Sequence, residues 1–559
     1  MQKKYIPFIL AGAMIASASA SAAEFPTDVS EYIQQATGNG QYVGVIVGLV
    51  DNGDTAIKSF GVASKETGTA PDANTVFEIG SITKTFTATL LAEEVNAGRM
   101  KLSDPVQMYL PEGVTLAQVG DRPINLEDVA THRSGLPRVP ADFKIDDPRA
   151  PYKELDVEAL WGYVNMVKPA RAPGEAAEYS NFGFAVLGQL VARETGKSYG
   201  DLLKSRIFAP LGMASTDITL TDALKARAAQ GYGVDGKPAS YWTLTGFASA
   251  GAINSTMTDM LAYLKANMAA MDKTKGSDLS RAMALAQEPR ADMAPDGEIR
   301  IGLAWITTPT GGGHWHNGGT GGFRTFMGFT DDGKRGTVVL SNTGGAGVDE
   351  IGFHLLNAGA PLPAAQKKIA VAPEKLDEYV GTYAVTPQVA FTVKRENDTL
   401  QVQLTGQGFA PVYPDAPDHF FYTAVRADIT FERTDSGKVS GLVLHQNGRD
   451  TRADRLGPNG KPMVTVKHLD LTPSELDAYV GTYQLAPQAL FTITRDGAQL
   501  MVQLTGQPAF PVYADKTDHF FYRVVDAQID FTRDPSGKVT SLTLHQNGAD
   551  LPAPRVDGK

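Results

Sequence analysis

Ser81 and Lys84 are the first residues of this chain whose types and spacing could do chemistry. If a helix begins at Ser81, positions i and i+3 lie on one face, so the lysine amine can reach the serine hydroxyl. The hydroxyl would also lie at the positive end of the helix dipole, where developing negative charge is stabilised. The pair fits a serine nucleophile that forms an acyl-enzyme and divides one difficult displacement into two easier ones, and taken alone it fits the start of a surface helix as well.

A tyrosine and an asparagine in the run Tyr179-Ser180-Asn181 could help to move the proton of such a nucleophile. A free phenol has a pKa of about 10, so Tyr179 acts as a base near neutral pH only if nearby cations stabilise the phenolate. Lys84 can provide that charge, or it can be the base itself if burial lowers its own pKa. The residues alone leave this choice open.

Other kinds of site find little support in the sequence. His314 and His316 lie two positions apart, on one face of a strand, as the start of a metal site would. No His-Glu-x-x-His run and no carboxylate at matching spacing follow, so we expect neither a metal nor another cofactor. Ser81 does not stand in a Gly-x-Ser-x-Gly run, which excludes an α/β-hydrolase. The chain has no cysteine, so thiol nucleophiles and thiolate zinc sites are excluded too.

The catalytic runs occur in the order that one known family uses. Ser81-Ile82-Thr83-Lys84 matches its S-x-x-K motif, and Tyr179-Ser180-Asn181 matches its Tyr-x-Asn motif. His316-Asn317-Gly318 stands where Lys-Thr-Gly is usual. The chain thus resembles the class C β-lactamases, D,D-peptidases and related esterases and D-aminopeptidases over residues 30–357. Shorter stretches that also fit are 102–105, 131–136 and 207–213.

The resemblance implies a role for each matching residue. The nucleophile and the groups that handle its proton are Ser81, Lys84 and Tyr179. The residues implied to bind the substrate or its oxyanion are Asn181, His316, Gly318 and Gly319. Of these, Asn181 would orient Lys84 and donate to a substrate carbonyl, while the backbone N–H groups of Ser81 and Gly319 would form the oxyanion hole.

His316 is the departure from the family pattern. A lysine there would hold a permanent positive charge beside the substrate carboxylate, whereas a free imidazole has a pKa of about 6.5 and is largely neutral at pH 7. Its attraction for an anion should therefore be weak and depend on pH. Relatives with histidine here resemble D-aminopeptidases, esterases and amidases more than efficient β-lactamases. Arg324, just after the glycine-rich turn, could replace the missing cation and bind a carboxylate through two hydrogen bonds.

Strand patterns at both ends of residues 24–357, with helical patterns between them, predict the elements that carry these residues. A hairpin is expected from Val43 to Val50 and, after the turn 51–54, through Phe60. Helices are expected over 81–95 and 184–195, and later strands at 325–330 and 337–341. We therefore expect an α+β domain, one antiparallel sheet flanked by helices, as in β-lactamases and penicillin-binding proteins.

The last third of the chain contains a sequence repeat. The run Tyr379-Val380-Gly381-Thr382-Tyr383 returns 100 residues later, and so does the run at 418–422. Alternating apolar and polar residues at 400–404 are typical of half-buried strands. We expect two small antiparallel β-barrels at 374–457 and 474–559, after linkers at 358–373 and 458–473. The barrel histidines are expected to be structural, because one active site cannot use both copies; they are His419, His445, His519 and His545.

Residues 1–23 have the form of a secretory signal peptide, with two lysines, an apolar run at 6–15 and small residues up to Ala23. The apolar run is shorter than the ~20 residues that span a bilayer, so we expect cleavage and a periplasmic or secreted chain without a membrane span. A formal net charge of −11 argues against a nucleic-acid-binding protein.

These features favour an exported serine hydrolase that cleaves amide bonds of small peptides, either D-residue-containing peptides or linearised cyclic ones. A carboxylesterase or a weak β-lactamase of the same family stays open, because an uncharged residue at 316 suits neutral acyl groups. A non-catalytic penicillin-binding or peptidoglycan-sensing protein, in which the acyl-enzyme persists, stays open as well. The sequence specifies neither the substrate nor the oligomeric state.

Overall fold

The computed structural model describes the chain from residue 23 onward, with gaps. The described residues are 23–141, 143, 151–153, 155–273, 276–294, 297–308, 313–363, 368–386, 388–422, 427–434, 436–446, 449–457, 469, 471–522, 527–546 and 549–556. The predicted signal peptide, except for Ala23, and most of the predicted linker 458–473 lie outside this set. Among the residues described, no helix has both the length and the apolar character needed to cross a membrane.

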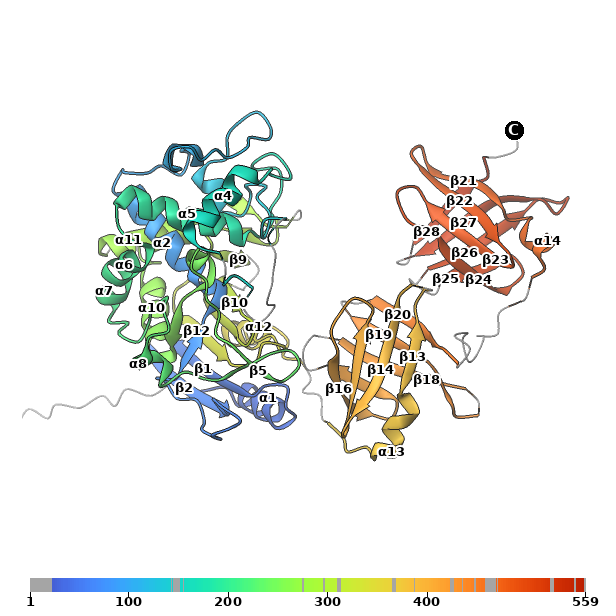
Figure 1. Ribbon diagram of the computed structural model, residues 1–559, viewed down its shortest axis with the longest axis horizontal. Helices are drawn as coiled ribbons and strands as arrows, with labels where there is room; N and C mark the ends of the chain where they lie inside the picture. The colour runs from blue at the N-terminus through green and yellow to red at the C-terminus, as the bar shows by residue number, and fades with distance from the viewer. Residues whose placement is uncertain are drawn as a thin grey trace, which may run out of the picture.

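An eight-stranded antiparallel sheet joins the two ends of the first part of the chain (Figure 1). Its order is β2-β1-β12-β11-β10-β9-β8-β7, so the first strand lies beside the last. The strands are β1 (Gly44–Asp51), β2 (Asp54–Gly61), β7 (Ala291–Asp292), β8 (Arg300–Ile301), β9 (Ile306–Thr308), β10 (Gly313–Gly319), β11 (Arg324–Phe329) and β12 (Arg335–Ser341). The predicted hairpin is the β1–β2 pair, whose turn has positive φ at Asn52 and Gly53, as a two-residue hairpin turn requires.

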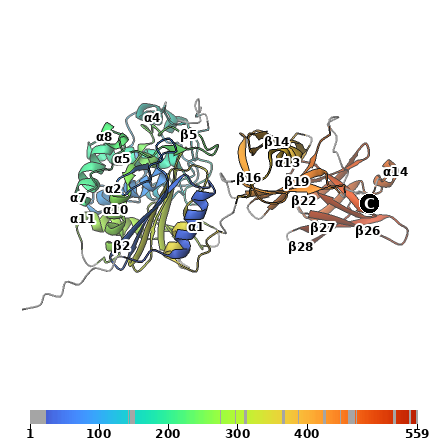
Figure 2. The same cartoon turned by 90° about the horizontal axis from the view of Figure 1, so that it is seen from below.

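Helices cover both faces of this sheet, as Figure 2 shows for α1 on one side and α10 on the other. The inward residues of β1 alternate accordingly: Val45 and Val47 pack with α1 and α12, and Ile46 packs in the larger core on the other face. The helices are α1 (Thr27–Gly38), α2 (Thr83–Asn96), α3 (Leu126–Ala130), α4 (Val157–Met166), α5 (Asn181–Thr195), α6 (Tyr199–Leu203), α7 (Ala209–Leu211), α8 (Asp222–Lys225), α9 (Ala248–Gly251), α10 (Met257–Ala269), α11 (Asp278–Gln287) and α12 (Asp349–Leu356). Shorter elements are η1 (Gly80–Ile82), η2 (Val106–Tyr109), the π-helical turn η3 (Lys204–Phe208), and the strands β3 (Val76–Glu78), β4 (Gly231–Tyr232), β5 (Pro238–Ala239) and β6 (Asn254–Thr256).

Helix α2 lies inside this arrangement and is buried on nearly every side, including the lysine Lys84. It contacts α5, α9 and α11. The helix that follows the nucleophile is therefore a central element of the core, and its polar side chains must find partners within the protein.

Two eight-stranded antiparallel units follow, as the repeat predicts. The first is a closed barrel of β13 (Gly381–Ala384), β14 (Ala390–Glu396), β15 (Thr399–Leu404), β16 (Ala410–Ala416), β17 (His419–Tyr422), β18 (Ala427–Arg433), β19 (Val439–Gln446) and β20 (Arg449–Arg455), preceded by α13 (Pro373–Leu376) and η4 (Asp377–Tyr379). The second has β21 (Gly481–Ala486), β22 (Ala489–Asp496), β23 (Gln499–Leu504), β24 (Phe510–Lys516), β25 (His519–Tyr522), β26 (Ala527–Arg533), β27 (Val539–Gln546) and β28 (Ala549–Pro554), preceded by α14 (Pro473–Leu476). Each has a hydrophobic core of its own. The predicted limits of the domains and linkers stay predictions.

Candidate functional site

Ser81 lies in the tight turn η1, two residues before the regular helix α2 begins at Thr83. The predicted helix start at Ser81 is early by these two residues, and strand β10 packs closely against the turn. Gly80 has a φ of +53°, and a Cβ at this position would lie 2.7 Å from the backbone nitrogen of Gly319. A Cβ on Gly318 would lie 2.0 Å from the carbonyl oxygen of Ile79. Glycines thus allow the nucleophile turn and β10 to lie side by side, which an oxyanion hole from Ser81 and Gly319 needs.

The Lys84 amine is fully buried and is held by three oxygen atoms. Its Nζ lies 3.1 Å from Ser81 Oγ, 2.9 Å from Asn181 Oδ1 and 2.7 Å from the carbonyl oxygen of Ala250. Burial, followed by the positive charge of Arg138, lowers the pKa of Lys84 well below its ordinary value. The structure therefore brings together Ser81, Lys84 and Asn181, and it favours an uncharged amine.

Tyr179 lies just before α5, whose first turn is capped by the hydroxyl of Ser180, which accepts from the backbone nitrogen of Gly183 at 2.8 Å. The Lys84 Nζ is 4.8 Å from the centre of the Tyr179 ring, and the guanidinium carbon of Arg138 is 5.3 Å from it. Burial raises the pKa of Tyr179 well above its ordinary value, and this outweighs the opposing effects of the Ser81 hydroxyl and Arg138. Tyr179 is therefore a neutral phenol at neutral pH.

His316 on β10 is fully buried, and its ring centre lies 6.2 Å from that of Tyr179. Its Nδ1 is 2.6 Å from the carbonyl oxygen of Asn317, so Nδ1 carries the proton of the neutral ring. Burial and then the nearby Lys84 lower the pKa of His316 to about 3. The expectation of a pH-dependent attraction near neutrality was therefore wrong, because this imidazole stays neutral.

His132 lies beside the site, although its residue type and spacing predicted no role for it there. Its ring centre lies 4.3 Å from that of Tyr179, and its Nδ1 accepts a hydrogen bond of 3.0 Å from the backbone nitrogen of Ser180. The only signal for it was its place in the stretch 131–136 that fits the family. His132 thus packs against Tyr179 and fixes the backbone that carries it.

A cavity of about 70 Å³ opens at the nucleophile. Its walls are formed by Gly80, Ser81, Arg138, Tyr152, Asn181, Trp242, Leu244, Phe247, Ala250, Gly251, Gly319 and Thr320. Arg138 was not predicted, since nothing in the sequence relates it to Ser81. Arg324 does not line this cavity: its guanidinium donates to the carbonyl oxygens of Thr320 and Phe323, at 2.7 and 2.8 Å. Its predicted role in binding a carboxylate stays a prediction.

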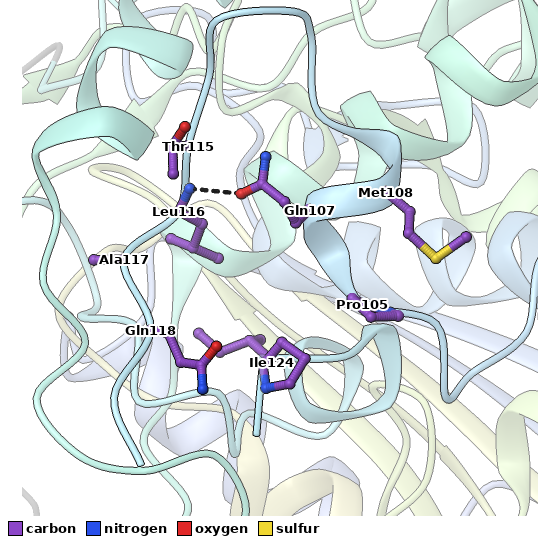
Figure 3. Close-up of a pocket in the computed structure, with 9 residues that line it drawn as sticks. Pro105, Gln107, Met108, Thr115, Leu116, Ala117, Gln118 and Ile124 are labelled. Carbon is purple, nitrogen blue, oxygen red and sulfur yellow. Dashed lines mark hydrogen bonds between the residues drawn. The ribbon is translucent and has the colours of Figure 1, made fainter. Parts of the chain in front are cut away.

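A larger cavity, of about 690 Å³, lies elsewhere in the same part of the chain (Figure 3). One of its walls is fixed by the hydrogen bond of 3.0 Å from the Leu116 nitrogen to the Gln107 side chain. Its lining is Pro105, Gln107, Met108, Thr115, Leu116, Ala117, Gln118, Pro123 and Ile124. Because these side chains include no titratable group, we base the function on the smaller cavity at Ser81.

The histidines outside the cavity have structural partners. The His314 ring stacks on Phe329 with centres 5.2 Å apart, and its Nε2 lies 3.4 Å from Asp331. In the part of the chain that the structure describes, no group of three or more histidine, cysteine or acidic side chains is arranged to hold a metal ion. The four barrel histidines each bond an aspartate, through the pairs His419–Asp415, His445–Asp450, His519–Asp515 and His545–Asp550.

Known protein families match both the first part of the chain and the two repeats that follow it. The profile of the family described as Beta-lactamase matches residues 29–358, and the profile described as Domain of unknown function (DUF3471) matches residues 365–455 and 469–557. The D-alanyl-D-alanine-carboxypeptidase/endopeptidase AmpH of Escherichia coli (strain K12) is 27% identical over 330 residues, 57% of this chain and 84% of that protein. The unguisins hydrolase ungD' of Aspergillus campestris is 28% identical over 428 residues, 72% of this chain and 76% of that protein.

The fold agrees with these matches. A solved structure described as a class C beta-lactamase has a TM-score of 0.52 and 25% identity, and the match covers 60% of this chain and 96% of that one. The predicted α+β fold with an antiparallel sheet flanked by helices is thereby confirmed. Since the first family profile covers more than half of its residues, the chain belongs to the Beta-lactamase family and is a serine hydrolase.

Proposed function

We propose that this protein is an exported hydrolase that cleaves amide bonds of small peptides through an acyl-enzyme on Ser81. The observation that carries the proposal is the Lys84 amine, which is buried, low in pKa and 3.1 Å from the Ser81 hydroxyl. One relative supports a peptide substrate by name, a D-alanyl-D-alanine-carboxypeptidase/endopeptidase, and a second is named as a hydrolase. We extend this to peptides with a D-residue beside the scissile bond, including linearised cyclic peptides.

The hydrogen bonds of Lys84 define the direction of the first proton transfer. A neutral amine has two N–H donors and one lone pair. The carbonyl of Ala250 and the side-chain oxygen of Asn181 can only accept, so they take both N–H groups. In the neutral amine the lone pair is then left for the Ser81 hydroxyl, whose oxygen lies 3.1 Å away, so the O–H of Ser81 would donate to Lys84. We therefore propose Lys84 as the general base, in preference to Tyr179.

Acylation follows from this arrangement. Ser81 Oγ attacks the amide carbonyl carbon while its proton passes to Lys84, and the negative charge on the carbonyl oxygen is stabilised by the N–H groups of Ser81 and Gly319. The C–N bond then breaks, and the leaving amine takes a proton from the Tyr179 hydroxyl. Tyr179 regains its proton from the ammonium of Lys84. Tyr179 can act as this acid because burial keeps it protonated.

Deacylation repeats the same steps with water as the nucleophile. The water attacks the acyl carbonyl and gives a proton to Lys84, the bond to Ser81 Oγ breaks, and Ser81 recovers its proton. The net reaction converts an amide and water into a carboxylic acid and an amine. Asn181 supports both halves, because its side chain holds Lys84 and also lines the cavity.

The location of this chemistry is proposed to be the periplasm or the medium. The support is the signal-like run of residues 1–23, which ends in small residues up to Ala23. Mass measurement of the protein purified from the periplasm of an expressing bacterium tests the export. An N-terminus near residue 23 is the expected result, and a chain that stays inside the cell with its N-terminal run intact would contradict it.

A carboxylesterase is the second candidate, because the neutral His316 leaves no cation at the position that a lysine usually occupies. Intact-mass and product measurements with a D-alanyl peptide amide, a p-nitrophenyl ester and a penicillin separate the alternatives. We expect turnover of the peptide and the ester, with only slow turnover of the penicillin. Turnover of the ester alone would establish an esterase, and a persistent adduct without product would establish a sensor protein.

A further inference from the structure

Arg138 is an exposed cation at the mouth of the active-site cavity, and the catalytic steps do not use its side chain. It lines the same cavity as Ser81 and Asn181. Its guanidinium carbon lies 5.3 Å from the Tyr179 ring centre, and its charge lowers the pKa of the buried Lys84. Arg138 therefore lies close enough to the reacting groups for its charge to be felt by a bound substrate.

Few other cations near the cavity could bind an anionic group of the substrate. Arg138 is the one charged side chain among the described residues that line the cavity. Burial lowers the pKa of Lys84 well below its ordinary value, and His316, with a pKa of about 3, stays neutral across the physiological range. The guanidinium of Arg324 is already engaged by two backbone carbonyl oxygens.

The guanidinium of Arg138 is the group that could hold such an anion. Among the described residues, no carboxylate forms an ion pair with it. An arginine presents a planar set of N–H donors that matches a carboxylate through two hydrogen bonds. A further part of the cavity wall is aromatic, with Tyr152 lying 5.5 Å from Trp242 and 5.1 Å from Phe247 between ring centres. The cavity thus offers one cation and an apolar wall.

We infer that Arg138 determines specificity by binding a carboxylate of the substrate, so that the enzyme prefers anionic small peptides whose carboxylate lies close to the scissile amide. This inference rests on the proposed amide hydrolysis and names its substrate class. The carboxylate would lie against Arg138, and an apolar side chain of the same peptide would contact Trp242 and Phe247. Arg138 takes the place of the cation that the third motif of this chain lacks.

The test compares matched substrates that differ only in one charge. The pairs are N-acetyl-D-alanyl-D-alanine with its C-terminal amide, and N-succinyl-D-alanine p-nitroanilide with its N-acetyl counterpart. Hydrogen bonds between charged groups contribute about 1.5–3 kcal/mol, which corresponds to a preference of roughly 10- to 100-fold in kcat/KM. We expect the wild type to show this preference in at least one pair. Equal kcat/KM values within both pairs would overturn the inference.

Arg138→Gln should bring the ratio of kcat/KM between the anionic and neutral members close to one, and any change that it causes through Lys84 and Tyr179 should affect both members alike. Its fold should be unaffected, because the main-chain bond from the Phe182 nitrogen to the carbonyl oxygen of residue 138, 3.1 Å long, does not need the side chain. Arg138→Lys keeps the charge but loses the paired geometry, and we expect it to keep part of the preference. Arg324→Lys is the matched control and should keep all of it. A preference that survives in Arg138→Gln but disappears in Arg324→Lys would assign the carboxylate to Arg324.

Binding without turnover separates this inference from the proposed function. Calorimetry with Ser81→Ala measures the affinity for the same pairs, and Arg138→Gln in that background should weaken only the anionic members. This result would support Arg138 even if the wild type hydrolysed only esters. Equal affinities of the anionic and neutral members for Ser81→Ala would contradict the role of Arg138 while leaving the acyl-enzyme intact.

Discussion

The side chain of Asn181 and the carbonyl of Ala250 each accept a hydrogen bond from Lys84, and in the proposed mechanism this leaves the lone pair of the neutral amine to Ser81. Only the neutral amine can accept the serine proton, so kcat/KM should fall as the pH drops through the lowered pKa of Lys84. His316 should add no second limb between pH 5 and 8, because its pKa is about 3. A pH–rate profile of the wild type and of His316→Gln checks this, and a limb near pH 6.5 that disappears in the variant would contradict it.

Replacement of Lys84 by arginine introduces a permanent positive charge where the structure favours an uncharged amine, and it removes a group that can lose its proton near neutral pH. We expect kcat/KM to fall by about 10²- to 10⁴-fold in Lys84→Arg, the range typical for loss of a general base. Lys225→Arg on α8, at an exposed position, is the matched control and should keep full activity. Steady-state assays with a D-alanyl peptide amide measure both, and comparable rates for the two variants would exclude Lys84 as the base.

At the scale of elements, glycines allow the closest approach of the nucleophile turn η1 to strand β10. Gly80→Ala should place its new methyl group against the backbone of Gly319, in addition to the strain of a left-handed φ. Gly98 has the same kind of φ, at +73°, but no atom within 4 Å of a Cβ there, so Gly98→Ala carries the strain without the contact. We expect at least a tenfold loss of kcat/KM in Gly80→Ala and almost none in Gly98→Ala.

Urea unfolding of both glycine variants completes the comparison. Left-handed strain costs about 1–2 kcal/mol, so both variants should lose a similar amount for that reason, and Gly80→Ala should lose more. If Gly80→Ala retains wild-type activity, the close approach of η1 and β10 is not needed for an oxyanion hole.

Much of this arrangement could be predicted because it is local in the sequence. The spacing of Ser81 and Lys84 and the run from Tyr179 to Asn181 are short, and alternation along the strands is visible residue by residue. The burial of α2 could not be predicted, because a helix enclosed on all sides has no amphipathic pattern. The low pKa of His316 depends on that enclosure, so the ordinary value of the free imidazole gave the wrong expectation. Arg138 was missed because its place in the cavity is created by tertiary packing, which no spacing in the chain records.

In the whole molecule, the catalytic part and the two barrels have separate hydrophobic cores. A chain that ends at residue 365 should therefore fold and still hydrolyse a p-nitrophenyl ester. If a barrel narrows access to Ser81, this shortened chain should accept longer peptide amides than the full chain does. Measured rates for a series of peptide lengths decide the point, and an unchanged length preference in an active fragment would refute a gating role.

The first barrel should respond to pH through His419. Burial lowers the pKa of His419, but the carboxylates of Asp415 and Asp428, at 2.5 and 3.0 Å, outweigh it and raise the pKa above 6.5. Protonated His419 therefore stabilises the folded barrel. This stabilisation is complete at a pH below the pKa of His419 in the unfolded chain, and it is lost as the pH rises through the higher pKa of the folded state. The first barrel should therefore lose stability above about pH 6.5.

The second repeat provides the matched change, because Gln528 stands where the first repeat has Asp428. In the full-length chain, Asp428→Gln should lower the Tm at pH 5.5 and flatten its dependence on pH, since one of the two carboxylates that stabilise the imidazolium is gone. Thermal unfolding followed at several pH values measures both effects. A pH dependence as steep as that of the wild type would show that His419 does not contribute.

The central claim is that Ser81 carries the acyl group, and rapid quenching with intact-mass measurement tests it most directly. The full chain mixed with a p-nitrophenyl ester and quenched in acid should gain the mass of one acyl group, and peptide mapping should locate that group on Ser81. Ser81→Ala should gain no mass and should lose activity toward esters and D-alanyl peptide amides alike. An acyl group found on another residue, or full activity in Ser81→Ala, would contradict the account.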